Sequence, residues 1–399
     1  MIRKLWLSSE RDWLSELESV GADPGAWSRV RLRSEVMVLK AGPFPAPAAN
    51  ILKQCMLSAG GDAIVARGTI DCTVRETQAI LIGTPKHIGL AADSLSGQPF
   101  GLSELGGQLK LALRPQDLPP ELRLKPGDLS YANGPLIMGV LNVTPDSFSD
   151  GGLYSSPVRA IERAMEMLGQ GAAVVDIGAE STRPGSSPVP PEVQIERLLP
   201  IIRGICDRAP SAILSVDTNS STVAAAALDA GVSMVNDVTA LSDPGMAPLA
   251  ASRGCPIVLM HMKGIPADMQ DSPCYSDVAG EVYSFLEDRV AKAEAAGVTR
   301  DRILVDPGIG FGKRLEDNLD LLRRLGELRS LGCRTVIGYS RKSFLGALTG
   351  ERDPAARDTA GHAIAALACD TADIIRVHDV EGTFAVLTAA MALAGKVRR

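Results

Sequence analysis

Carboxylate and amide side chains stand at the ends of three short apolar runs. Asp217 and Asp306 each end one run, and Asn236 follows another. Such groups can pair with the amino and ring N–H groups of a flat heterocycle. They disfavour analogues that lack those groups, because buried polar atoms would then stay unpaired. The three residues predict a site for a hydrogen-bonding heterocycle. The alternative is that one or two of them cap strands or pair with a neighbouring lysine.

Cationic side chains in similar positions predict an anion site. Lys342 follows one apolar run, and Arg376 and His378 stand at the end of the last run. Arg183, beside Thr182 in a polar loop, carries the planar cation that suits phosphate or diphosphate. The alternatives are a surface salt bridge for Arg183 and a hydrogen-bonded strand-end position for His378.

Two of the intervening loops are rich in glycine. The loop 142–152 is too long for a tight strand-to-helix connection, which favours a lid over a substrate. Asn142 at its start could bind a hard cation, or one carried by phosphate, or it could form a local turn. The three glycines between positions 308 and 312 lack the spacing of a phosphate-binding loop. We expect them to allow close packing against a ligand, with Phe311 available to stack.

The elements that must position these side chains are short apolar runs alternating with helical segments. About eight such runs follow position 135, as expected for buried parallel strands. They cover residues 137–141, 173–177, 213–216, 233–235, 256–260, 303–305, 335–338 and 373–377. Eight strand–helix units predict a closed (β/α)8 TIM barrel, and an open doubly wound sheet is the alternative. Nearly every run ends in a polar residue, and only a barrel brings all eight strand ends to one face.

A Pro-rich stretch divides the chain. We predict a small α/β module over residues 1–115, a linker over 116–133 and the barrel over 134–399. In the module, residues 35–40 and 79–83 are expected to form strands and residues 48–58 a helix.

Composition excludes several classes of protein. A net charge of −6 gives no electrostatic reason to expect nucleic acid or an anionic membrane as the partner. Seven cysteines without a Cys-x-x-Cys pair argue against a disulfide framework or zinc site and favour a cytoplasmic location. The N-terminus lacks a secretory signal, and no long apolar span occurs. His87 and His261 fit structural or supporting roles better than catalytic ones.

Residues 135–380 resemble the dihydropteroate synthase family of the folate pathway. The resemblance rests on long motifs in the family's order. They are residues 142–152, Glu180-Ser-Thr-Arg-Pro-Gly185, Ser215-Val-Asp-Thr218, Asn236-Asp237, residues 306–313, Ser340-Arg-Lys-Ser343 and Arg376-Val-His-Asp379. It covers about two thirds of the chain and implies the barrel fold.

The resemblance implies an activity and roles for residues. The reaction would condense 6-hydroxymethyl-7,8-dihydropterin diphosphate with p-aminobenzoate, giving 7,8-dihydropteroate and pyrophosphate. The pterin would be contacted by Asp217, Asn236, Asp306 and Lys342, and the diphosphate by Thr182, Arg183, Arg376 and His378. Asn142 would bind Mg²⁺ carried by the diphosphate. The aminobenzoate would be contacted by Phe311 and Ser343, and the loops that carry Phe148, Asp150 and Pro184 would close over the site. The residues expected to carry the chemistry are Lys342, Arg376, His378, Asp217 and Asp306. A homodimer with small-molecule substrates is the expected assembly.

Two other functions stay open at the level of sequence. One is a pterin-binding, corrinoid-dependent methyltransferase domain. It would not need Thr182-Arg183, Lys342-Ser343 and Arg376/His378 together as an anion site. The other is a non-catalytic pterin-binding barrel, which would not need convergent charge. The family's minimal form starts just before the first strand, so the N-terminal module is a departure from it. The favoured role of this module is to brace the barrel or to mediate assembly.

Overall fold

The computed structural model describes residues 2–3, 5, 10–23, 25–113, 118–143, 156–180, 189–264, 269 and 273–394. The chain forms two compact units, Met1–Asp117 and Leu118–Arg399. Each unit has its own hydrophobic core.

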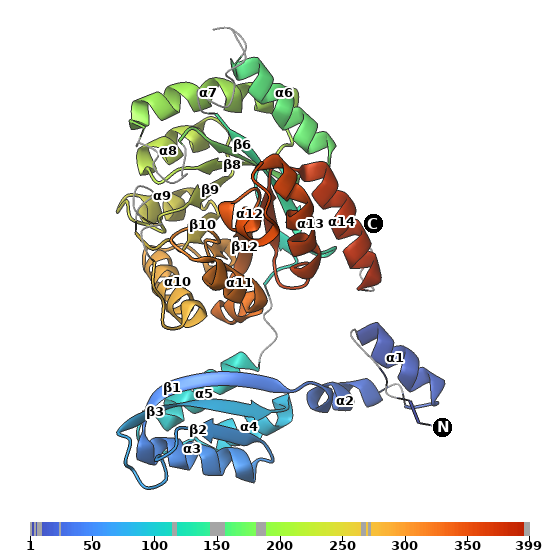
Figure 1. Cartoon of the computed structure of the whole chain (residues 1–399), viewed down its shortest axis with the longest axis vertical. Helices are drawn as coiled ribbons and strands as arrows, with labels where there is room; N and C mark the ends of the chain where they lie inside the picture. Colours follow the sequence, from blue (N-terminus) through green and yellow to red (C-terminus); the bar gives the residue numbers. More distant parts are fainter. Residues whose placement is uncertain are drawn as a thin grey trace. The chain divides into compact units, whose positions relative to one another are not determined.

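The N-terminal unit is a small α/β fold, as predicted (Figure 1). Its sheet has the order β1-β3-β2 with antiparallel neighbours. Strand β3 alternates between exposed and buried residues, and Leu81 on its buried side packs with Leu52 and Ile88 of the helices that cover one face of the sheet. The elements are α1 (Glu10–Ser19), α2 (Ala26–Ser34), β1 (Met37–Pro45), α3 (Ala46–Ser58), β2 (Asp62–Val65), β3 (Glu76–Gly83), α4 (Pro85–Ser94) and α5 (Leu102–Ala112).

A short ribbon of β4 (Glu121–Leu122) and β5 (Leu129–Ser130) precedes the barrel. Its Leu122 and Leu129 are buried in one cluster with residues from the starts of the barrel strands. Arg334, which is 2% exposed, lies 4.4 Å from the centre of the Tyr131 ring and donates a hydrogen bond to the carbonyl of Pro119. Part of the stretch that we predicted as a linker therefore packs in the barrel unit.

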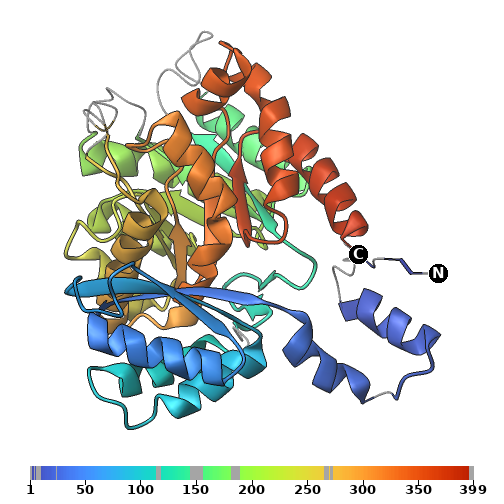
Figure 2. The same ribbon diagram turned by 60° about the horizontal axis from the view of Figure 1, so that its bottom comes forward.

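The second unit is a closed barrel of eight parallel strands, which confirms the predicted fold (Figures 1 and 2). Each predicted apolar run forms one strand, with ends that differ by at most two residues. The strands are β6 (Leu136–Asn142), β7 (Val174–Gly178), β8 (Leu214–Asp217), β9 (Met234–Asp237), β10 (Ile257–Met260), β11 (Ile303–Asp306), β12 (Arg334–Gly338) and β13 (Ile374–Val377).

Helices follow the strands and surround them in Figure 1. Their apolar sides share a large core cluster with the outward-facing strand residues. The helices are α6 (Ser156–Gly169), α7 (Pro191–Arg208), α8 (Ser221–Asp229), α9 (Met246–Arg253), α10 (Val278–Ala295), α11 (Leu315–Arg323), α12 (Ser343–Thr349), α13 (Asp358–Leu367) and α14 (Val380–Leu393), with short 3₁₀ segments at Arg300–Arg302, Leu325–Leu331 and Ala355–Arg357.

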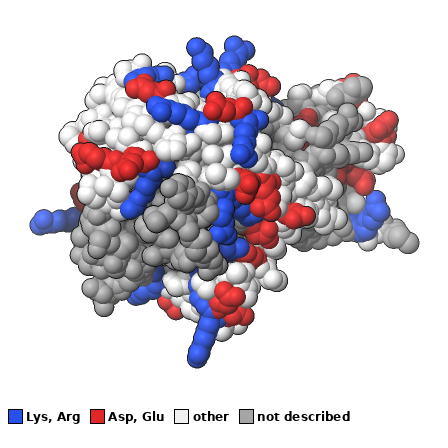
Figure 3. Space-filling model, turned by 90° about the horizontal axis from the view of Figure 1, so that it is seen from above, with Lys and Arg blue, Asp and Glu red and all other residues white. Residues whose placement is uncertain are grey.

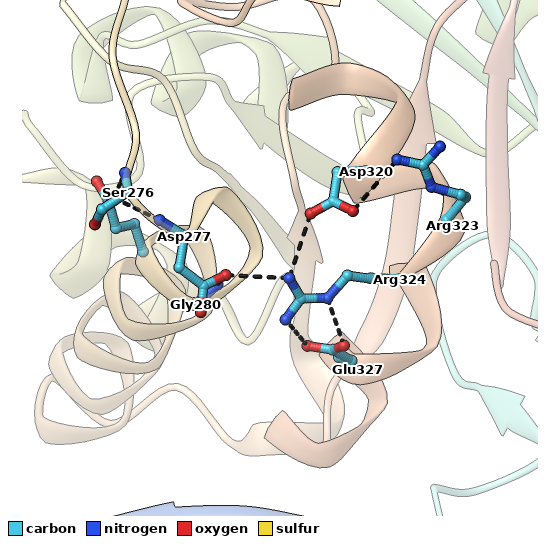
Figure 4. A network of polar contacts seen from close by, with 8 residues as sticks. Ser276, Asp277, Gly280, Asp320, Arg323, Arg324 and Glu327 are labelled. Carbon is cyan, nitrogen blue, oxygen red and sulfur yellow. Dashed lines mark hydrogen bonds and ion pairs between the residues drawn. The ribbon is translucent and has the colours of Figure 1, made fainter. Parts of the chain in front are cut away.

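Arg324 fixes the wall beside β11 through a set of ion pairs (Figure 4). Its Nη1 donates to Asp277 at 3.1 Å and to Asp320 at 3.3 Å, and its Nε donates to Glu327 at 2.7 Å. Asp277 is also the N-cap of α10, where it accepts the N–H of Gly280. One guanidinium therefore ties the start of α10 to the end of α11.

The surface carries both signs of charge. On the face shown in Figure 3, Lys and Arg side chains lie among Asp and Glu side chains. Within the described residues, no helix is both long enough and apolar enough to cross a membrane.

Candidate active site

The barrel interior is built in layers, because alternate residues of each strand face the same side. The lower layer is apolar and includes Met138, Val174, Met234, Leu304 and Ile374. Two residues further along four of these strands, toward the carboxyl ends, stand Asp176, Asn236, Asp306 and Arg376. Period-two alternation thus places an apolar floor beneath a polar layer at the face where barrel enzymes keep their sites.

The guanidinium of Arg376 joins two carboxylates in this polar layer. Its Nε donates to Oδ2 of Asp176 at 2.6 Å, and its Nη2 donates to Oδ2 of Asp217 at 2.6 Å. The amide nitrogen of Asn236 donates to the same oxygen of Asp176 at 3.0 Å. Three of the predicted site residues therefore form one hydrogen-bonded group with Asp176.

Asp176 was given no role from sequence, although it lies in the predicted run 173–177, two residues before the end of β7. Its side chain is fully buried, and its Oδ1 has no hydrogen-bond partner among the described residues. Its position at a strand end was the only available signal, and that signal does not distinguish a carboxylate that binds ligand from one that orients an arginine.

Burial and mutual charge shift the pKa values of this group. Burial raises the pKa of Asp217 to about 7; the charge of Arg376 opposes this rise, and the carboxylate of Asp176 adds to it. Burial disfavours the cation of Arg376, but Asp176 and Asp217 raise its pKa above the ordinary value. Arg376 therefore stays charged, whereas Asp217 can change its charge near neutral pH.

Lys342, at the start of α12 after β12, and Asp306, at the end of β11, form a second charged group. The Nζ of Lys342 donates to the carbonyl of Ile309 and lies 4.1 Å from the centre of the Phe311 ring. Burial lowers the pKa of Lys342 to about 7, and the charge of Asp306 opposes this shift. Burial raises the pKa of Asp306, against the charge of Lys342 and the hydrogen bond from the N–H of Gly308.

Gly338 lies where the two charged groups approach each other. A Cβ atom at this position would lie 3.8 Å from side-chain atoms of Arg376 and 3.9 Å from Oδ2 of Asp306. The three carboxylates, both cations and the amide of Asn236 are thus gathered around one end of the barrel.

Three glycines shape the turn that carries Phe311. Gly308, Gly310 and Gly312 have φ angles of +66°, +83° and +59°, a region that side chains with a Cβ rarely adopt. A Cβ on Gly308 would lie 1.8 Å from the carbonyl oxygen of His261. The glycines therefore allow close packing of the backbone against the protein itself, with the turn held beside Lys342.

The remaining predicted residues lie around this group. Nδ1 of His378 is 3.0 Å from the hydroxyl of Ser340, which also accepts the backbone N–H of His378 at 3.2 Å. Ser343 is exposed at the first residue of α12, and Asn142 is half-buried at the last residue of β6. Thr182, Arg183, Phe148, Asp150 and Pro184 lie outside the described residues, so their roles stay predictions.

Two histidines occupy supporting positions. His87 lies in the first turn of α4, where its backbone N–H donates to Thr84 Oγ1 and its Nδ1 accepts the N–H of Thr84. His261 lies against Lys313, with 3.0 Å between its Nδ1 and the Nζ of Lys313. Sequence reasoning gave Lys313 no role, because a lysine near a glycine-rich turn resembles any other loop cation until its burial is known.

The arrangement can bind a polar heterocycle beside an anion. Asp217, Asp306 and Asn236 offer acceptors for N–H groups, and Arg376, Lys342 and His378 offer donors and positive charge. Among the described residues, no group of three His, Cys, Asp or Glu side chains could hold a metal ion by itself.

These features define a TIM-barrel enzyme with a ligand site at the carboxyl ends of its strands. The sequence model of the family described as Pterin binding enzyme matches residues 138–378. The chain belongs to this family.

Relatives carry more specific names. The chain is 42% identical over 257 residues to the dihydropteroate synthase of Escherichia coli. This match covers 64% of this chain and 89% of that protein. It matches the structure of Xanthomonas albilineans dihydropteroate synthase with 4-aminobenzoic acid at 42% identity and a TM-score of 0.65, covering 69% of this chain and 98% of that one.

The N-terminal unit also has relatives. The chain is 41% identical over 370 residues to a probable bifunctional folylpolyglutamate synthase/dihydropteroate synthase of Halobacterium salinarum. This match covers 92% of this chain and 44% of that protein, so it includes most of the N-terminal unit. The chain thus spans less than half the length of this relative.

Proposed function

We propose that this protein is a dihydropteroate synthase. It would condense 6-hydroxymethyl-7,8-dihydropterin diphosphate with p-aminobenzoate to give 7,8-dihydropteroate and pyrophosphate. The observation that carries the proposal is the meeting of acceptors Asp217, Asn236 and Asp306 with cations Arg376 and Lys342 at one barrel end. The names of the E. coli and X. albilineans relatives support it.

The pterin would lie in the plane of the acceptors. Because Nδ2 of Asn236 donates to Asp176, its carbonyl oxygen faces away from that carboxylate and can accept from a ligand. The carboxylates of Asp217 and Asp306 would accept further N–H groups, and Lys342 would donate to an acceptor on the ring. An analogue that lacks these N–H groups would leave buried acceptors unpaired.

The diphosphate would lie beside Arg376 and His378, with Thr182 and Arg183 adding contacts. Asp176 and Asp217 hold two edges of the Arg376 guanidinium, which fixes its plane before substrate binds. A fixed cation stabilises the charge that develops on the departing oxygen without having to reorganise.

Magnesium would enter with the diphosphate. The neutral oxygen of Asn142 fits a hard cation that takes most of its ligands from phosphate and water. When bound, the ion would neutralise charge on the leaving diphosphate.

The bond changes need no covalent intermediate with the protein. The C–O bond between the pterin methylene and the diphosphate breaks, and its electron pair leaves with pyrophosphate. The amine nitrogen of p-aminobenzoate forms the new C–N bond and releases one proton. We propose a dissociative order, in which the carboxylates of Asp217 and Asp306 favour the cationic methylene. Phe311 and Ser343 would flank the amine, and the loops carrying Phe148, Asp150 and Pro184 would close over it.

Pyrophosphate release tests this proposal. Purified protein is mixed with the dihydropterin diphosphate and Mg²⁺, with and without p-aminobenzoate. Release that requires p-aminobenzoate and yields dihydropteroate is the expected result. Pterin binding without any product would contradict it and favour the methyltransferase or the non-catalytic barrel. Absence of positional oxygen exchange in the diphosphate without p-aminobenzoate would count against the dissociative order.

We further propose a homodimer, small-molecule substrates without nucleic-acid or membrane partners, and a cytoplasmic location. The N-terminal module of residues 1–115 would brace the barrel of residues 134–399 or mediate assembly, with part of residues 116–133 packed in the barrel unit.

A further inference from the structure

A buried lysine lies directly beneath the site without a role in the chemistry above. Lys313 is 3% exposed. Its Nζ lies 3.0 Å from Nδ1 of His261, 2.9 Å from the carbonyl oxygen of Gly308 and 3.0 Å from that of Phe311. All of these atoms are acceptors, and an ammonium group supplies the three protons that they need.

The turn from Gly308 to Lys313 directs its donors and acceptors to different partners. The N–H of Gly308 donates to Oδ1 of Asp306 at 2.7 Å, and the N–H of Gly310 donates to Oδ1 of Asn318 at 2.6 Å. Carbonyls of the same turn converge on Lys313. Without the ammonium group the carbonyl of Gly308 would keep only the N–H of Phe311, and the carbonyl of Phe311 would lose the donor that Lys313 supplies; such a loss destabilises the conformation that creates it.

The same turn forms one wall of the proposed site. It carries Phe311, and the carbonyl of Ile309 accepts a hydrogen bond from Lys342. Its Gly308 also fixes one oxygen of Asp306. Lys313 is therefore linked through the backbone of this turn to Phe311, Lys342 and Asp306.

His261, which contacts Lys313, is itself held in place by its neighbours. Its ring packs edge-on to Phe285 with centroids 4.9 Å apart, and its backbone N–H donates to the carbonyl of Asp306 at 3.0 Å. Burial lowers the pKa of Lys313 well below its ordinary value, and the charge of Asp306 opposes this shift. As an ammonium group Lys313 donates to Nδ1 of His261, and the neutral ring then carries its proton on Nε2. Burial, together with the charge of Lys313, lowers the pKa of His261 to about 3, which keeps the ring neutral.

We propose that Lys313 is a positioning residue for the amine side of the site, with His261 as its fixed acceptor. This inference rests on the proposed synthase function. It predicts that loss of the Lys313–His261 contact weakens the use of p-aminobenzoate, which Phe311 would flank, more than the use of the dihydropterin diphosphate.

The first test is Lys313→Met, which keeps the length of the side chain and removes its donors. The expected result is a rise of at least about tenfold in KM for p-aminobenzoate, with a smaller change in KM for the pterin. Arg334→Met is the matched control, since it removes a buried cation at the opposite end of the barrel. It should lower Tm and leave both KM values unchanged.

The second test uses His261 in case Lys313→Met does not fold. His261→Asn keeps an acceptor near the position of Nδ1, and His261→Leu removes it. The expected result is a near-normal KM for p-aminobenzoate in the Asn variant and a raised KM in the Leu variant. Equal KM values in the two variants, or a Lys313→Met enzyme with lower kcat and unchanged KM values, would overturn the inference. An inactive wild-type enzyme would instead overturn the proposed function.

Discussion

Asp176 and Arg376 lie 200 residues apart in the sequence and meet at the mouth of the barrel in a hydrogen bond of 2.6 Å. Asp176 is fully buried, and it also accepts from Asn236. One carboxylate thereby orients a cation proposed to bind the diphosphate and an amide proposed to bind the pterin.

Asp176→Asn should therefore impair the use of both halves of the pterin substrate. We expect kcat/KM for the dihydropterin diphosphate to fall by about 10- to 100-fold, since a hydrogen bond to a charged group contributes about 1.5–3 kcal/mol. Steady-state kinetics and Tm measure the effect. Asp373→Asn is the control, because Asp373 accepts the N–H of Thr335 at the other end of the barrel. A similar loss of kcat/KM in both variants would contradict a specific role for Asp176.

The dependence of kcat/KM on pH should form a narrow bell. Asp217, whose pKa is raised to about 7, offers its full set of acceptors and its negative charge only when ionised, so activity should rise as pH increases through its pKa. Lys342, whose pKa is lowered to about 7, donates best when charged, so activity should fall as pH increases through its pKa. Because these groups interact, the two apparent pKa values of the profile belong to the whole set of groups and not to single residues.

Lys342→Arg separates the two limbs of this profile. Arginine stays charged over the range, so the falling limb should disappear while the rising limb stays, at a lower maximal rate. Measurement of kcat/KM for the pterin substrate from about pH 5.5 to about pH 9 resolves both limbs. A falling limb that persists in the variant would assign it to another group.

Gly308→Ala should destabilise the barrel far more than Gly350→Ala. Both glycines have positive φ, +66° and +79°, but only Gly308 would place a Cβ 1.8 Å from a carbonyl oxygen; at Gly350 nothing lies within 4 Å. The control variant should lose about 1–2 kcal/mol of stability from backbone strain alone. Gly308→Ala should lose more and also raise KM for p-aminobenzoate. Urea unfolding measures the first effect, and equal losses would contradict the close packing of the turn.

A variant that begins at Leu118 should remain folded, because the barrel unit has its own core and keeps the β4–β5 ribbon. A variant that begins at Leu136 should have a much lower Tm. It loses the burial of Leu122 and Leu129, which stabilises by about 1.5–3 kcal/mol each. Thermal unfolding compares the two.

The longer variant also tests the N-terminal module. If the module mediates assembly or braces the barrel, its removal should change the sedimentation behaviour or the kinetics of the protein. Unchanged oligomeric state and kinetics in the variant from Leu118 would contradict both roles.

The sequence by itself determined the barrel strands and the polar residues at their ends. A buried parallel strand needs a continuous apolar run, so β7 and β11 could be read from residues 173–177 and 303–305. The chemistry of Asp217, Asn236 and Asp306 followed from the residue types and from their common position after such runs.

Only the tertiary structure decided how these side chains pair. The contact of Arg376 with Asp217 spans 159 residues, and that of Lys313 with His261 spans 52. Both depend on the closure and register of the barrel, which set the neighbours and heights of the strand ends. Local pattern determines which face a residue takes, but burial and pairing across strands are properties of the closed barrel. That is the physical reason why Asp176 and Lys313 stayed without a role until the fold was known.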